Sequence, residues 1–190
     1  MIRMESLSVS RPLVQVLAVL LLALSGCIDS EVTEIVAERV DKSDAWTITY
    51  TFDGLFSDSE DPAVQQRDFL DIVKSWKGDL DVDSEVRNLG LSKGRLVGHM
   101  KARVKAEDLF HDSGWVIDSL GYHVPVEPPD SIVHTNGTVE LRGKGRVVTW
   151  SPRARRLELK VMKAVGTHLP QRGNLVPYYQ AYIESTSISK

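Results

Sequence analysis

Apolar and polar residues alternate over long stretches of the chain, and this period of two predicts half-buried β-strands. The clearest stretch is 95–105, where Arg95, Lys101, Arg103 and Lys105 fall on one side of the alternation. The other side carries apolar or small residues, namely Leu96, Gly98, Met100, Ala102 and Val104. The sequence therefore predicts a strand with one buried face and a basic outer row. The strict alternation argues against a helix here.

A second alternating stretch lies at residues 34–52. Trp46, Ile48 and Tyr50 alternate with threonines, and a polar turn at residues 41–44 comes before them. β-Branched and aromatic residues favour strands. We expect two strands joined by this turn.

Two segments have helical patterns instead. Asp61 is placed as an N-cap, Pro62 stands at the first helical position, and Gly78 ends the segment. Between them, five apolar residues lie mostly on one helix face: Val64, Phe69, Ile72, Val73 and Trp76. Near the end of the sequence, Pro177 and the tyrosines after it predict a short helix held against the sheet, with an edge strand as the alternative.

Turn residues divide the second half of the chain into short segments. Residues 114–120 predict a strand, and the proline-rich residues 123–130 predict a connection that cannot be a central strand. Asn136-Gly137 is the strongest hairpin signal, because both residues tolerate the positive φ of a type I′ turn. Further turns are expected at residues 143–145 and 152–155. Together these segments predict a meander of short antiparallel strands.

The predicted fold class is therefore α+β. An antiparallel, curled β-sheet is covered on one face by the helix after Asp61, and a short C-terminal helix is added. We expect a single globular domain over residues 45–190. Residues 27–44 are expected to form a short acidic tether and a first strand.

The first 26 residues have the order of a secretory signal peptide, with a charged start, an apolar stretch from Leu13 to Leu24, and two small residues. A membrane-spanning helix needs about 20 apolar residues, so this stretch is too short for a permanent transmembrane anchor.

The tetrapeptide Leu24-Ser25-Gly26-Cys27 resembles the bacterial lipobox. The resemblance implies that signal peptidase II cuts before Cys27, and that this residue carries thioether-linked diacylglycerol and an N-terminal acyl chain. Two or three chains give stable membrane attachment, at about 0.8 kcal/mol per buried methylene. An ordinary signal peptide with a stray cysteine is the alternative. Ile28, rather than an aspartate, follows the cysteine, which favours the periplasmic face of the outer membrane.

Cys27 is the only cysteine in the sequence. With lipid on its sulfur, the mature chain has no thiol for a disulfide, a thiolate metal site or a cysteine nucleophile. We expect no cofactor and no metal site.

Charge divides the chain into two unlike halves. Residues 28–85 carry 16 acidic and 5 basic side chains, whereas residues 86–190 carry 9 acidic and 16 basic ones. The halves can neutralise each other in one compact domain, or the basic half can face anionic lipid, lipopolysaccharide or an acidic envelope protein. Nucleic acid is not an expected partner outside the cytoplasm.

Two groups of basic residues are candidates for such a surface, each on its own predicted strand or turn. If they share one sheet face, they form a cationic surface suited to phosphorylated lipid, with Trp150 and other aromatic residues supplying apolar contacts. A face that only aids solubility is the alternative. The two groups are Arg95, Lys101, Arg103 and Lys105, and Arg153, Arg155 and Arg156 with Lys160 and Lys163 after them.

The segment PPDSIVHTNGTVELRGKGRVVTW, from Pro128 to Trp150, comes after the lipobox, the opening hairpin and the helix. This order resembles the LppM-like class of bacterial lipoproteins over about residues 31–150. The resemblance implies an antiparallel sheet domain suspected of binding lipid, and it supplies no catalytic motif. The chain departs from that class in having no obvious C-terminal membrane helix.

The sequence contains only weak patterns for a catalytic or a metal-binding site. His111-Asp112, His123 and His134 are residue types that bind zinc, but their spacing matches no zinc motif, so surface histidines are the simpler interpretation. No G-x-S-x-G motif marks a nucleophilic serine. The acidic segment 79–85 lacks the glycine and glutamate positions of an EF-hand.

We therefore expect a noncatalytic, lipid-anchored protein of the bacterial cell envelope whose sheet domain binds a partner protein or an amphiphilic ligand. The alternative is a small envelope hydrolase with an unrecognised Ser/His/Asp or metal site. That alternative predicts a pocket in which a histidine lies within hydrogen-bond reach of a serine or a carboxylate.

Overall fold

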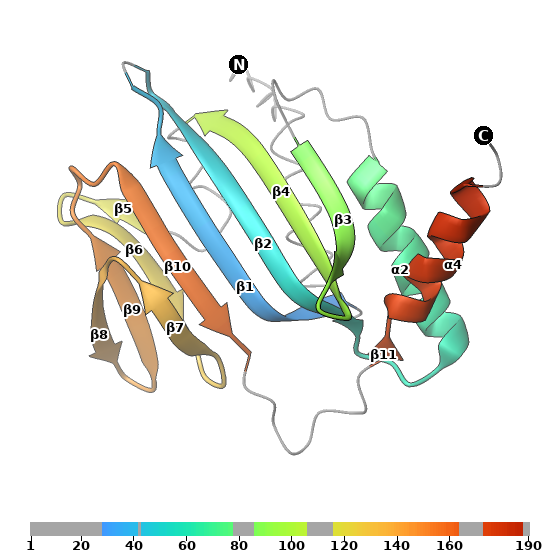
Figure 1. Ribbon diagram of the computed structural model, residues 1–190. Helices are drawn as coiled ribbons and strands as arrows, with labels where there is room; N and C mark the ends of the chain where they lie inside the picture. The colour runs from blue at the N-terminus through green and yellow to red at the C-terminus, as the bar shows by residue number, and fades with distance from the viewer. Residues whose placement is uncertain (1–27, 42, 78–85, 106–115, 164–172, 188–190) are drawn as a thin grey trace, which may run out of the picture.

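The computed structural model describes residues 28–41, 43–77, 86–105, 116–163 and 173–187. Within these ranges, all strand pairs are antiparallel and form two sheets, and two helices pack at one side of the larger sheet (Figure 1). The predicted α+β class, the antiparallel pairing and the C-terminal helix are confirmed.

The large sheet has seven strands in the order β3-β4-β2-β1-β10-β7, with β11 paired to the end of β2. The hairpin predicted around residues 41–44 is present, because β1 pairs with β2 along nearly its whole length. The strands are β1 (Ile28–Arg39), β2 (Ala45–Ser57), β3 (Val86–Ser92), β4 (Arg95–Lys105), β7 (Ser131–Thr135), β10 (Arg156–Met162) and β11 (Gly173–Asn174).

The small sheet has four strands in the order β5-β6-β9-β8. It packs against one end of the large sheet, so that this part of the molecule is a sandwich (Figure 1). The strands are β5 (Val116–Asp118), β6 (Gly121–Val126), β8 (Thr138–Arg142) and β9 (Gly145–Trp150).

The first core lies between the two sheets. Alternate residues of β2 from Trp46 to Tyr50 and of β4 from Met100 onward point into it, and the small sheet contributes Tyr122, Val148 and Trp150. The rings of Trp46 and Tyr122 meet edge to face with their centroids 5.5 Å apart. The alternation predicted for β4 is confirmed from Gly98 onward, because Gly98, Met100 and Ala102 are buried whereas the residues between them are exposed.

The prediction of one curled sheet is wrong, because the linker Asn136-Gly137 carries the chain from the large sheet to the small one. β7 pairs with β10 and β8 pairs with β9, so β7 and β8 do not form the predicted hairpin. The strands are thereby divided between two sheets, and neither sheet is curled or closed.

The side chain of Asn136 explains why this dipeptide is not a type I′ turn. It accepts a hydrogen bond from Trp150 Nε1 at 2.6 Å and donates one to the carbonyl of Arg156 at 3.0 Å, so it joins the two sheets. Gly137 does not have a positive φ. A Cβ at Gly137 would lie 2.8 Å from the Trp150 ring, so glycine is needed here for close packing.

The proline-rich segment was expected to lie outside any central strand, and this prediction is wrong. β6 contains Pro125 and lies between β5 and β9. In the described part of the chain, β5 pairs with β6 only from Gly121 to His123. Among the described residues, the strand neighbour of Pro125 is Val147 of β9.

Helix α2 (Pro62–Lys77) begins as predicted. The Asp61 carboxylate accepts a hydrogen bond from the N–H of Ala63 at 2.8 Å, which caps the first turn. The helix is fixed to the end of β2 by the buried hydroxyl of Ser57, which donates to Asp68 Oδ2 at 2.6 Å. Trp76 lies outside the described side chains.

The second core joins α2 to helix α4 (Val176–Ser187). Phe69 of α2 lies against three aromatic rings of α4, with centroids 6.1 to 6.5 Å away. The edge-strand alternative for this segment is therefore wrong. The three rings belong to Tyr178, Tyr179 and Tyr182.

β1 begins at Ile28, one residue after Cys27. The first strand expected within residues 27–44 is present as β1, and it pairs with β2 on one side and β10 on the other. Cys27 itself lies outside the described residues.

Candidate functional site

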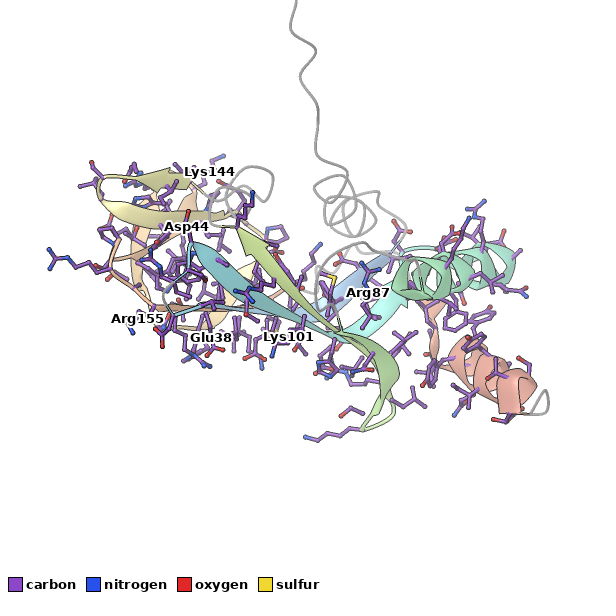
Figure 2. All side chains as sticks on the ribbon, turned by 90° about the horizontal axis from the view of Figure 1, so that it is seen from above. Glu38, Asp44, Arg87, Lys101, Lys144 and Arg155 are labelled. Carbon is purple, nitrogen blue, oxygen red and sulfur yellow. The ribbon has the colours of Figure 1, made fainter. Side chains whose placement is uncertain are left out.

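One face of the large sheet points away from the small sheet, and we call it the open face. It is built from the residues of β4, β2, β1 and β10 that alternate with the core residues. In Figure 2, Glu38 and Lys101 lie along the lower side of the large sheet, whereas Lys144 of the small sheet lies on the upper side. The open face is therefore a broad polar surface on the same strands that form the core.

Strand register arranges the open face in rows. One row runs Lys101, Thr49, Val36 and Glu158 across β4, β2, β1 and β10. The rows on either side follow the same strand order: Arg103, Thr47, Glu38 and Arg156, and His99, Thr51, Glu34 and Lys160. Read along the strands, these rows give a basic stripe on β4, a threonine stripe on β2, and an acidic stripe on β1.

The basic stripe consists of Lys101, Arg103 and Lys105. All three side chains are exposed, and Lys101 and Arg103 have no ion-pair partner among the described residues. Their nearest neighbours across the sheet on β2 are threonines rather than carboxylates. Within the described ranges, two positive charges on this stripe are therefore not neutralised by a carboxylate.

The threonine stripe of Thr47, Thr49 and Thr51 was expected only as the polar side of a strand, and no role was assigned to it. These side chains are half-buried, and Thr51 Oγ1 lies 3.1 Å from His99 Nδ1 on β4. Hydroxyl groups donate readily to anionic oxygens, and ammonium and guanidinium groups add charge to such bonds. The two stripes together have the chemistry of an anion-binding surface.

The basic residues of β10 are paired. Arg156 lies in ion pairs with Glu38 of β1 and Glu158 of β10, and Lys160 Nζ lies 3.8 Å from Glu34 Oε2. Because β2 and β1 separate β4 from β10, the acidic residues of β1 interrupt the cationic surface. The condition set for a shared cationic surface is met, because residues of both basic groups lie on this one sheet face. The carboxylates of β1 nevertheless lie between the two groups and pair with the residues of β10.

The other predicted binding residues are scattered. Arg95 is half-buried and pairs with Glu31 and Asp53, so its charge is neutralised within the sheet. Arg155 pairs with Asp41 at 3.0 Å. Arg153 is exposed on the turn between β9 and β10.

Trp150 is not a surface residue. It is 4% exposed, and it packs between the sheets with its indole N–H bonded to Asn136. The expectation that it contacts a ligand is wrong, because the alternation of β9 directs it into the core. Trp46 is likewise buried, and Trp115 lies outside the described residues.

A second polar arrangement lies on the small sheet around the buried His123. Its Nδ1 lies 3.0 Å from Thr149 Oγ1, and its Nε2 lies 3.0 Å from Asp118 Oδ1. Asp118 also accepts hydrogen bonds from the N–H groups of Leu120 and Gly121. The hydrogen bond from His123, followed by those from the main chain, lowers the pKa of Asp118 below its usual value.

This arrangement has the residue types of a catalytic triad, but Thr149 lies in the middle of β9. β9 pairs with β6 on one side and β8 on the other, so its N–H groups are used in the sheet and not directed at a substrate oxyanion. The chain Asp118–His123–Thr149 instead holds the β5–β6 hairpin against β9.

The remaining histidines do not join this arrangement. His99 and His134 are exposed on the large sheet, and His134 Nε2 lies 3.0 Å from Glu158 Oε2. His111 and His168 lie outside the described residues. Among the residues that the structure describes, no three His, Cys, Asp or Glu side chains are placed to hold a metal ion.

We expect Asp118→Asn to destabilise the fold at neutral pH and to matter less in acid. The folded-state pKa of Asp118 lies below its unfolded value, so the ionised carboxylate stabilises the fold above the ordinary pKa of 3.8. This contribution is lost as the pH falls through the lowered folded-state pKa. Thermal unfolding midpoints of both proteins, measured from neutral pH down to strong acid, should converge. A difference that is independent of pH would show that Asp118 does not act through its charge.

Neither helix in the described ranges is long and apolar enough to cross a membrane. Comparison of the chain with protein-family models, with curated proteins and with solved structures finds no match in any of the three.

Proposed function

We propose that the protein is a noncatalytic, lipid-anchored component of the bacterial envelope whose open face binds the phosphate groups of an anionic amphiphile. The observation that carries the proposal is the pair Lys101 and Arg103, exposed beside a stripe of hydroxyl groups and without carboxylate partners among the described residues. By contrast, the basic residues of β10 on the same face, Arg156 and Lys160, each have a carboxylate partner. Among the described residues of the open face, the basic side chains without a carboxylate partner thus lie on β4.

The size of the effect can be estimated from the charges. A Lys or Arg near an anionic membrane surface contributes about 1 kcal/mol of attraction at physiological salt. Lys101 and Arg103 together would contribute about 2 kcal/mol, which corresponds to roughly thirtyfold in affinity. Hydrogen bonds from Thr47 and Thr49, the direct neighbours of these two residues, add a geometric preference for phosphate over a diffuse negative surface.

The predicted anchor supports an amphiphile as the ligand. β1 begins one residue after Cys27, so acyl chains on that cysteine would hold the sheet close to the bilayer surface. The sequence resemblance to the LppM-like lipoproteins points in the same direction. An acidic envelope protein is the alternative ligand for the same stripe.

The hydrolase alternative has one observation in its favour, the chain Asp118–His123–Thr149. It predicts covalent labelling of Thr149 by a fluorophosphonate probe, abolished in Thr149→Val. The noncatalytic proposal predicts no labelling of either protein.

Binding of short-chain lipids to residues 28–190 tests the proposed function. We expect dihexanoyl-phosphatidylglycerol to bind, and dihexanoyl-phosphatidylcholine to bind much more weakly, in calorimetric titrations below the micelle concentration. Lys101→Glu combined with Arg103→Glu should weaken phosphatidylglycerol binding by about thirtyfold or more. Higher salt should weaken the binding of the unmodified domain.

The matched control is Lys144→Glu combined with Arg153→Glu, which makes the same change in net charge at exposed sites outside the stripe. It should change the affinity by less than about threefold, because the Debye length at physiological salt is about 8 Å. Equal losses in the two variants would mean that only net charge matters. Binding of neither lipid would overturn the lipid proposal and leave an acidic protein as the ligand.

A further inference from the structure

In the part of the chain that the structure describes, β8 is an edge strand of the small sheet. It pairs with β9 alone in the sheet order, and all five of its residues are exposed. Leu141 is 79% exposed and Val139 is 43% exposed, although both are on the apolar side of the strand. Edge strands of this kind can pair with a further strand unless proline, a bulge or a covering segment prevents it.

The register of β8 shows which of its main-chain groups are free for pairing. β8 and β9 are joined by the two-residue turn Gly143-Lys144, and Arg142 pairs with Gly145. In such a hairpin the closing pair exchanges hydrogen bonds, and the pattern alternates along the ladder. Thr138, Glu140 and Arg142 therefore bond toward β9, while Val139 and Leu141 direct their N–H and C=O groups to the open edge.

The charges on β8 are arranged symmetrically for antiparallel pairing with an identical strand. Glu140 and Arg142 flank Leu141, and their side chains lie on the same side of the strand. A two-fold axis through Leu141 would place each Glu140 opposite the partner's Arg142. The neighbouring register, centred on Glu140, would instead place two carboxylates opposite each other, which is unfavourable.

We infer that β8 pairs antiparallel with β8 of a second copy of this chain, centred on Leu141, to form a continuous eight-stranded sheet. The pairing uses the outward main-chain groups of Leu141, covers its exposed side chain and makes two cross-strand ion pairs between Glu140 and Arg142. The self-complementary charge pattern is what favours a second copy over an unrelated strand. The interface lies on the small sheet and does not involve the open face, so it is independent of the proposed ligand site.

Cysteine cross-linking in the full-length protein in its own membrane tests this pairing. In the inferred register the two Leu141 Cα atoms lie about 5.5 Å apart, within the range for a disulfide. Leu141→Cys should therefore give a dimer on non-reducing gels after mild oxidation with copper–phenanthroline. We expect at least fivefold more dimer than from Val139→Cys, because a two-fold axis through Leu141 leaves the residues 139 of the two chains far apart.

Charge reversal gives a second, independent measurement in the Leu141→Cys background. Glu140→Arg alone and Arg142→Glu alone should each reduce the dimer by at least threefold, and the double reversal should restore it. The unmodified chain is the control for cross-linking through Cys27. Equal cross-linking at positions 139 and 141, or no recovery in the double reversal, would overturn the proposal. More dimer from Glu140→Cys than from Leu141→Cys would indicate the register centred on Glu140. That result would overturn both the inferred register and the cross-strand pairing of Glu140 with Arg142.

Discussion

A chain in which Cys27 is replaced by serine is expected to leave the membrane fraction and to change its electrophoretic mobility. Serine cannot form the thioether to diacylglycerol, so the two or three acyl chains that give stable attachment are lost. Inhibition of signal peptidase II in cells that express the unmodified chain should cause an uncleaved form to accumulate. Fractionation of cell lysates and gel electrophoresis measure both effects. If location and mobility stay the same after the substitution, the lipid anchor does not exist.

The second large effect is expected in the core, where Trp150→Ala should lower the free energy of unfolding by about 3–5 kcal/mol. Trp150 fills the space between the sheets beside Gly137, and its indole N–H bonds to Asn136. Domains of this size have a total stability of about 5–15 kcal/mol, so the substitution removes a large share. The midpoint of urea unfolding measures the loss.

Two further variants separate packing from hydrogen bonding at this position. Trp150→Phe keeps an aromatic ring but removes the N–H, and it should cost less than the alanine variant. Leu141→Ala changes a residue that is mostly exposed in the single chain, and it should alter stability by less than about 0.5 kcal/mol. If Trp150→Ala is no more destabilising than Leu141→Ala, the indole does not support the contact between the sheets.

The parts of the fold that could be predicted depend on neighbouring residues in the sequence. The alternation of β4 and the cap of α2 by Asp61 are local patterns, and the structure confirms both. The β1–β2 hairpin also follows from adjacent segments. In each case, the residues that form the recognisable pattern in the sequence are the same residues that form the strand, the helix cap or the hairpin.

The parts that could not be predicted depend on strands that are distant in the sequence. Asn136-Gly137 has the composition of a hairpin turn, but the partners of β7 and β8 are β10 and β9, which no local pattern indicates. The same applies to Pro125, which lies in a strand paired with β5 and β9, a position that no local pattern indicates. Pairing between remote strands decided both outcomes.

The candidate site also has a part that could be predicted from local patterns and a part that depends on the order of distant strands. The basic row of β4 was visible in the alternation, whereas the neutralisation of Arg156 and Lys160 required the strand order that places β1 beside β10. Trp150 was assigned to the surface because its position in β9 relative to the core could not be known from composition. The threonine stripe was visible in the sequence, but only the strand register shows that Thr47 and Thr49 lie directly beside Arg103 and Lys101.

Mass spectrometry of the protein extracted from bacterial membranes in mild detergent tests the central claim most directly. The account predicts a chain that begins at a diacylglycerol-modified Cys27 and retains a phosphorylated lipid, with less lipid retained when Lys101 and Arg103 are both replaced by glutamate. An unmodified Cys27 together with equal lipid retention by the two proteins would contradict it.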